Sequence, residues 1–80
     1  MTLAELTLGA RATVDQVGGE RTVRRRLLEL GLLPQTEIRL MHVAPLGDPL
    51  SLRIRNTTLS IRRAEAEQIL ITAVEAAPAR

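Results

Sequence analysis

Apolar and polar residues alternate in five stretches of this chain, and such alternation is typical of strands. A strand points successive side chains to opposite faces of its sheet, so each stretch would bury one face and expose the other. In the second stretch the apolar positions switch sides after Leu40, which indicates a β-bulge near that residue. The five stretches are residues 10–17, 36–44, 50–55, 58–62 and 69–74.

Between the first two stretches the hydrophobic period becomes helical. At about 100° per residue, Val23, Leu27 and Leu30 fall within one narrow stripe. This spacing predicts a helix over residues 21–30 that packs on the core through that stripe. Gly31 suits the left-handed position that commonly follows a helix.

Turn-forming residues separate the remaining strands. Residues 44–49, with the sequence APLGDP, are dense in turn formers and are expected to form a loop. Asn56 and Thr57 are the expected hairpin turn, because asparagine tolerates a positive φ better than most residues. Single helical turns are expected at residues 2–5, which have the spacing of a capping box, and within 62–68.

Together these elements predict an all-β fold, a small barrel of about five short antiparallel strands with one α-helix after the first strand. A closed or nearly closed barrel of the SH3-like type suits so short a chain, because it removes exposed strand edges. We expect one domain over residues 1–75 and a flexible C-terminal tail over 76–80. The strand positions predicted to face inward are Ala10, Ala12, Val14, Ile38, Leu40, Leu50, Leu52, Ile54, Leu59, Ile61, Ile69 and Ile71.

Composition points to a small cytosolic domain. The 80 residues suffice for one domain, and the absence of cysteine removes disulfides and thiolate metal sites. The N-terminal stretch lacks the basic and apolar regions of a signal peptide, and no apolar run approaches the roughly 18 residues of a membrane span. We therefore expect a cytosolic protein that does not insert into a membrane.

The charge balance and the missing aromatic residues narrow the range of partners. All eleven basic residues are arginines, nine residues are acidic, and the net charge is only +2. The pI near 11.0 therefore reflects the high pKa of arginine more than a strong positive field. The chain has no Phe, Tyr or Trp on which bases could stack, or with which a groove for proline-rich peptides could be lined. Both kinds of binding are disfavoured.

Three consecutive arginines, Arg24 to Arg26, lie in the predicted helix. Successive helical residues are about 100° apart, so the three side chains fan around the helix instead of forming one basic face. Arg25 and Arg26 are also close enough along the helix to Glu29 to be partly neutralised. We interpret them chiefly as solvated flanks of the helix. Contact with an acidic protein surface is the alternative, and direct nucleic-acid contact is the least favoured hypothesis.

Two leucines stand outside the predicted core. Leu28 lies about 140° from Val23 on the helix. It would either tuck against Leu32 at the helix end or be exposed as an apolar anchor for a partner. Leu46 lies in the proline-stiffened loop, where it would either fold back to plug an open end of the barrel or be presented rigidly to a partner.

No group of residues suggests catalysis or metal binding. His42 is the sole histidine, and neither a cysteine nor a second histidine is available to complete a common metal site. The carboxylates Asp15, Glu20 and Asp48 are not clustered at ligand spacing. We therefore predict that the protein is not an enzyme and holds no cofactor or resident metal.

Three segments together resemble a known family. RRRLLELGLLPQTEI, then APLGDP, then LRIRNTTLSIRRAEAEQILI are similar in order and spacing to the ferrous iron transport protein A (FeoA) family, from about Thr2 to Ile71. The resemblance implies a bacterial SH3-like barrel that is an accessory partner of FeoB, the membrane ferrous-iron permease with a cytosolic G-protein domain. It also implies kinship with the C-terminal module of iron-dependent repressors. Asn56 stands where the family's hairpin often has glycine, which changes the turn little.

The leading hypothesis is an interaction module that docks on the intracellular G domain of the permease, at the inner face of the cytoplasmic membrane. The predicted contact residues are Leu46 and Asp48 in the loop, with Leu28 and Arg25 on the helix. The alternative is a regulatory SH3-like module that works with an iron-dependent DNA-binding repressor or another transcription factor, although no helix-turn-helix segment precedes the predicted barrel. Self-association stays open.

Overall fold

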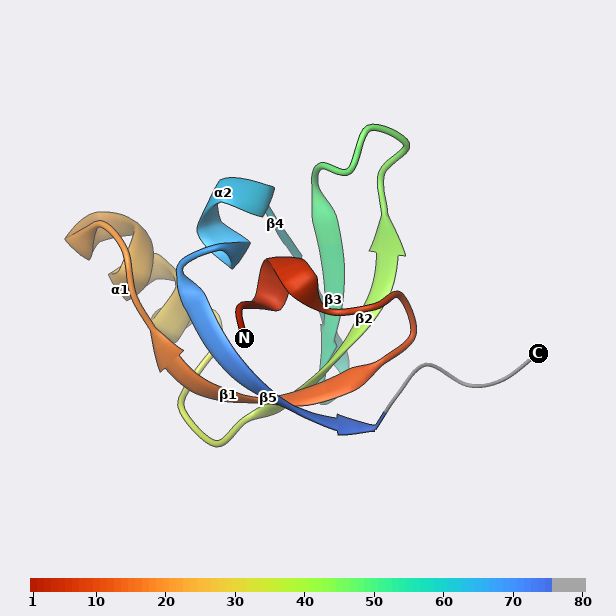
Figure 1. The fold of residues 1–80 in the computed structure, drawn as a ribbon. Helices are drawn as coiled ribbons and strands as arrows, with labels where there is room; N and C mark the ends of the chain where they lie inside the picture. Colours follow the sequence, from red (N-terminus) through yellow and green to blue (C-terminus); the bar gives the residue numbers. More distant parts are fainter. Residues whose placement is uncertain (76–80) are drawn as a thin grey trace.

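The computed structural model describes residues 1–75, which fold around one curved antiparallel sheet (Figure 1). The strand order is β4-β3-β2-β1-β5, and the main helix follows β1, as predicted. The C-terminal tail predicted over 76–80 lies outside the described residues. In chain order the elements are η1 (Leu3–Glu5), β1 (Arg11–Val17), α1 (Arg21–Glu29), β2 (Glu37–Val43), β3 (Leu50–Ile54), β4 (Thr57–Ile61), α2 (Arg63–Ala66) and β5 (Ile69–Glu75).

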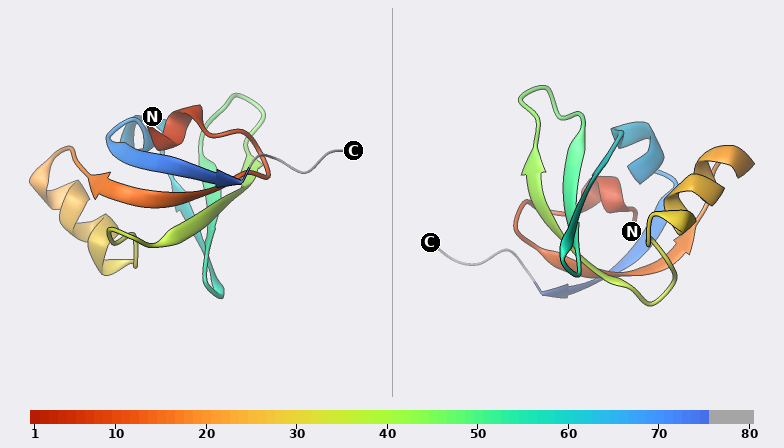
Figure 2. Two further views of the ribbon diagram at one scale, coloured as in Figure 1. Left: turned by 60° about the horizontal axis from the view of Figure 1, so that its bottom comes forward. Right: turned by 180° about the vertical axis from the view of Figure 1, so that it is seen from behind.

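The sheet curls into a small barrel that stays open between its edge strands (Figure 2). β4 and β5 are not hydrogen-bonded to each other, and α2 links them along the chain while contacting η1. The N-terminal segment covers part of the β5 edge. Thr2 forms a β-bridge with Leu70, and the Ile71 N–H donates to the Met1 carbonyl oxygen at 2.9 Å. The predicted SH3-like barrel is therefore confirmed in its nearly closed form.

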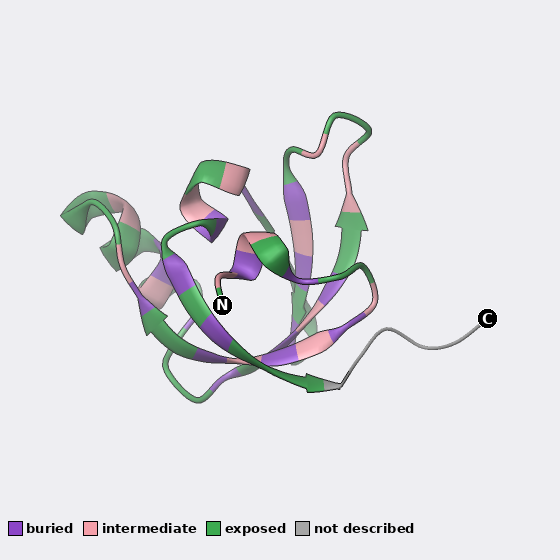
Figure 3. Cartoon of the chain, viewed as in Figure 1, coloured by how far each residue is buried: buried purple, intermediate pink, exposed green. Residues whose placement is uncertain are grey.

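Aliphatic side chains fill the barrel, because the chain has no aromatic residue. Every strand position predicted to face inward is buried, and the positions between them are mostly half-buried or exposed (Figure 3). A shift of one residue would turn each strand's apolar set toward solvent, so this alternation sets the register. Leu3 and Leu6 from the N-terminal segment, Leu27 from α1, Leu32 after it and Ala66 from α2 complete the core.

The end of α1 differs from the prediction. Leu30 was expected on the buried stripe, but it is 46% exposed. The chain leaves the helix at Gly31, which has a φ of 107°. The Gly31 N–H donates to the Leu28 carbonyl oxygen at 3.1 Å, and the Leu32 N–H donates to the Leu27 carbonyl oxygen at 3.0 Å. This bond pair is a Schellman motif, and it brings Leu32 into the core in place of Leu30.

The β-bulge predicted near Leu40 is confirmed. Leu40 pairs with Leu52 and His42 pairs with Ser51, so Met41 is an extra residue in β2. The extra residue shifts the pairing by one, which explains why the apolar positions switch sides along this strand.

The hairpin between β3 and β4 turns one residue earlier than predicted. Ile54 pairs with Thr57, so the two turn residues are Arg55 and Asn56. The positive φ, 56°, belongs to Arg55. The prediction gave this role to asparagine because it tolerates the left-handed region best, but the register of the strands places Arg55 there.

Both predicted helical turns are present. In η1 the Thr2 N–H donates to Glu5 Oε1 at 2.6 Å, and this bond to the charged carboxylate lowers the pKa of Glu5. In α2 the Arg62 N–H donates to Glu65 Oε1 at 3.0 Å. Each glutamate therefore satisfies a backbone donor at the start of its own helical turn.

Candidate functional site

Loop 44–49 projects from one end of the barrel, between β2 and β3 (Figure 1). The Gly47 N–H donates to the Ala44 carbonyl oxygen at 2.7 Å and closes a turn around Leu46. Leu46 is 97% exposed, so the interpretation that it plugs the barrel is wrong. The loop instead presents this leucine to solvent.

One arginine fixes this loop to the rest of the domain. Arg63 Nε donates to the Gly47 carbonyl oxygen at 2.7 Å, and Arg63 Nη1 donates to the Ala4 carbonyl oxygen at 3.1 Å. The backbone N–H of Arg63 donates to Asp48 Oδ1 at 2.9 Å. The planar guanidinium carries several donors in a fixed geometry, so a single side chain bridges the loop and the N-terminal segment. The presentation of Leu46 is therefore held in place.

The predicted contact residues on α1 have different surroundings. Leu28 is half-buried and packs against the core, while Leu32 is fully buried. Arg25 is exposed, and its Nε lies 3.8 Å from Glu29 Oε2, a separation at which an exposed pair contributes little. Arg26 does not share this partner. Its Nη2 donates to Glu65 Oε2 at 2.5 Å and ties α1 to α2.

The four predicted contact residues do not form one site. Leu46 and Asp48 share loop 44–49, whereas Leu28 and Arg25 belong to α1. The loop and the helix lie on opposite sides of the molecule in the views of Figures 1 and 2. A single partner would need to extend across the barrel to touch both.

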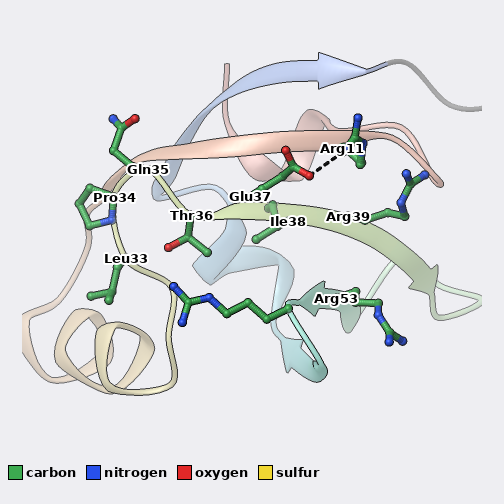
Figure 4. A pocket seen from close by; sticks show the side chains of 10 residues that line it. Arg11, Leu33, Pro34, Gln35, Thr36, Glu37, Ile38, Arg39 and Arg53 are labelled. Carbon is green, nitrogen blue, oxygen red and sulfur yellow. Dashed lines mark hydrogen bonds and ion pairs between the residues drawn. The ribbon is translucent and has the colours of Figure 1, made fainter.

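A groove of about 600 Å³ lies on the outer face of the sheet, beside residues 33–36 (Figure 4). Arg39 on β2 is directly opposite Arg11 on β1 and Arg53 on β3. Arg11 Nη1 donates to Glu37 Oε1 at 2.6 Å, and Arg39 Nη1 donates to the Gly9 carbonyl oxygen at 2.6 Å. The groove therefore carries a row of arginines across three strands.

Sequence reasoning missed this row. Its members are separated by 28 and 14 positions in the chain, and each taken alone is an ordinary outward-facing strand residue. The row exists because β1, β2 and β3 pair in one particular register. Alternation identified the outward face of each strand, but the pairing of strands was needed to bring the arginines together.

Metal-binding clusters and membrane-spanning helices are absent from the part of the chain that the structure describes. Within residues 1–75, no three histidine, aspartate or glutamate side chains gather in a way that could hold a metal ion. His42 is exposed on β2. Among residues 1–75, none of the helices could serve as a membrane span.

The sheet order, the open barrel and the single main helix define a small SH3-like domain. Residues 1–73 match the FeoA domain, so the chain belongs to the FeoA family. This family is associated with ferrous iron transport and is not a known enzyme family. The resemblance and the fold inferred from the sequence are both confirmed.

The chain is similar in sequence to three iron transport proteins, and it is similar in fold alone to a fourth protein. It is 38% identical over 69 residues to the Fe(2+) transport protein A/Fe(2+) transporter FeoB fusion protein of Porphyromonas gingivalis (strain ATCC BAA-308 / W83), a match over 86% of this chain and only 8% of that protein. FeoA of Chlorobium tepidum is 42% identical with a TM-score of 0.88, over 92% of this chain and 70% of that chain. Stenotrophomonas maltophilia FeoA complexed with zinc, a prokaryotic SH3 domain protein, is 33% identical with a TM-score of 0.78, over 90% and 89%. A manganese-dependent transcriptional repressor, 16% identical with a TM-score of 0.83 over 92% and 41%, shares the fold alone.

Proposed function

We propose that this protein is a cytosolic, non-enzymatic accessory of ferrous iron uptake that docks on the intracellular G domain of the FeoB permease. The observation that carries this proposal is the Porphyromonas gingivalis fusion protein, in which a relative of this chain shares a polypeptide with FeoB. Fusion raises the effective concentration of one domain near another, which is useful where the two act together. Docking would bring the protein to the inner face of the cytoplasmic membrane.

Leu46 is the first contact candidate. Its side chain is almost fully exposed, and the loop that carries it is held by the bonds to Arg63. A rigid loop loses little conformational entropy when a partner covers its apolar side chain, so the contact gains affinity. Asp48 supports the same surface. Its Oδ1 accepts from the Arg63 N–H, and the exposed carboxylate keeps further acceptor capacity for a partner.

Leu28 and Arg25 are the second pair of candidates. Arg25 is solvent-exposed and weakly paired, so its guanidinium is available for a carboxylate of the partner. Leu28 is half-buried, and a partner would meet only the exposed part of its side chain. We expect this helix surface to contribute less than the loop.

The test is binding of the full-length protein to the cytosolic domain of the FeoB permease from the same organism, measured by calorimetry with and without guanine nucleotide. Leu46→Ala should weaken binding by about tenfold or more, as expected for an apolar anchor. Leu8→Ala is the matched control, because Leu8 is also an exposed leucine in a loop. Arg25→Gln is compared in the same way with Arg24→Gln. Absence of binding by the unmodified protein under both nucleotide conditions would contradict the proposal.

A second candidate function is a regulatory module that works with a DNA-binding repressor or another transcription factor. The observation that favours it is the shared fold with the manganese-dependent repressor. Co-purification of this protein with a transcription factor, and not with the permease, would favour this candidate over the first.

A further inference from the structure

The arginine row places like charges opposite each other on three neighbouring strands. Like charges directly opposite each other on one face of a sheet destabilise the strand pair, and Arg39 faces both Arg11 and Arg53 in this way. Arg11 Nη1 donates to the Glu37 carboxylate, and Arg39 Nη1 donates to the Gly9 carbonyl oxygen. The groove therefore holds three cationic side chains close together.

Positive charge is concentrated in this groove. Its lining contains four arginines, with Arg55 as the fourth, and one glutamate, a surplus of three positive charges. The whole chain has a surplus of only two, so the remainder of the protein is slightly acidic. The groove is thus a localised basic surface on a molecule that is otherwise close to neutral.

A smaller hollow with three aliphatic side chains in its lining adjoins the basic groove. It has a volume of about 180 Å³, and Leu33 and Arg55 line both depressions. Leu30 and Leu33 are each 46% exposed at this place, and Ile54 closes the hollow from β3. Figure 4 shows Leu33 and Pro34 at the end of the groove away from Arg39 and Arg53. A ligand in the groove could therefore meet arginines and leucines together.

Backbone conformations of high energy also gather here. Gln35 has a φ of 72° and Arg55 a φ of 56°, and these are the non-glycine residues with positive φ among residues 1–75. Both line the groove. Such conformations persist where the surrounding structure imposes them, and they are frequent at binding sites. Here both belong to tight turns, the β3–β4 hairpin and the turn closed by the Thr36 N–H on the Leu33 carbonyl oxygen, and these turns shape the rim of the groove.

We propose that the groove binds an acidic segment of a partner protein that also carries an aliphatic side chain. The arginine forks match carboxylates, and the hollow beside Leu33 would take the aliphatic group. A nucleic-acid strand fits less well, because the chain has no aromatic residue on which its bases could stack. Loop 44–49 lies at the opposite end of β2 and β3, so the two surfaces can be occupied at once. Only the identity of the partner rests on the proposed function: if that function is right, the acidic segment belongs to the permease.

The probe is a short synthetic peptide with glutamates on both sides of one leucine, titrated into the ¹⁵N-labelled protein and followed by NMR. Arg53→Gln/Arg55→Gln should weaken its binding by about tenfold or more, because each lost arginine removes charge-assisted hydrogen bonds. The control, Arg21→Gln/Arg24→Gln, removes the same charge from exposed positions of α1 and should change binding by less than about twofold at physiological salt. A peptide with glutamine in place of glutamate should bind about as weakly as the groove variant.

If the change at Arg55 disturbs the hairpin turn, the single variant Arg53→Gln replaces the double variant in this comparison. This variant should lose affinity for the peptide without a lower melting temperature, because it relieves repulsion within the row. Equal affinities of the groove and α1 variants, or no shift of the groove amides, would overturn the proposal. So would a thymidine oligonucleotide that displaces the peptide from the groove. Failure of the unmodified protein to bind the permease would count against the proposed function alone, because the peptide titration does not involve the permease.

Discussion

Replacement of Leu46 by alanine should leave the stability of the domain almost unchanged. Full burial of a leucine side chain stabilises a protein by about 1.5–3 kcal/mol. Leu46 keeps 97% of its surface exposed, so Leu46→Ala should change the free energy of unfolding by only about 0.1 kcal/mol. Leu32 is the matched control, because it is also a leucine outside the helices and strands but is 0% exposed. Leu32→Ala should lower the free energy of unfolding by about 2–5 kcal/mol.

Thermal unfolding followed by far-ultraviolet circular dichroism measures both effects. In a domain of this size, 1 kcal/mol shifts Tm by about 4–8 °C. The Tm of Leu46→Ala should therefore stay within about 1 °C of the unmodified protein, and that of Leu32→Ala should fall by about 10 °C or more. A fall of more than about 5 °C for Leu46→Ala would refute the reasoning, since it would mean that this side chain packs against the domain in solution.

Three further predictions concern the contacts that shape the domain. Arg63→Gln should lower the free energy of unfolding by about 1–3 kcal/mol, and hydrogen exchange should show loss of protection in loop 44–49 while the strands keep theirs. Gly31→Ala should cost about 1–2 kcal/mol in urea unfolding from backbone strain alone, because a Cβ at Gly31 meets no atom within 4 Å; an unchanged midpoint would contradict this. The pKa of Glu5 is lowered from 4.5 by its bond to the Thr2 N–H, so its stabilising effect is complete above that pH and is lost as the pH falls toward the lowered pKa. Glu5→Gln should therefore flatten this acidic part of the stability curve, and parallel curves for the two proteins would argue against the bond.

Strand alternation predicted the core of the sheet well, because the buried face of a strand follows directly from its period of two. The bulge at Met41 was predicted for the same reason, since an extra residue leaves its mark on the alternation. Leu30 was placed wrongly because a helical stripe continues only as long as the helix does. The turn at Gly31 ends α1 first, and Leu32 enters the core from outside the helix.

The candidate surfaces depended on information that a single sequence does not hold. Two positions for Leu46 were left open, and the turn from Ala44 to Gly47 decided between them. The arginine row depends on the register of three strands, and that register is a property of pairing between distant segments. Local patterns identify faces of elements, whereas a site is made where several faces meet.

The Arg63 guanidinium joins the Ala4 carbonyl oxygen, near the beginning of the chain, to the Gly47 carbonyl oxygen of loop 44–49. The first few residues are thus a structural part of the surface that presents Leu46, although they do not belong to it in sequence. Proteolytic trimming at the N-terminus, or a fragment that starts at β1, would remove one support of that surface together with the buried side chain of Leu3 and the bridge from Thr2 to β5. A loss of recognition after such trimming would therefore not require a direct contact between the partner and the first residues.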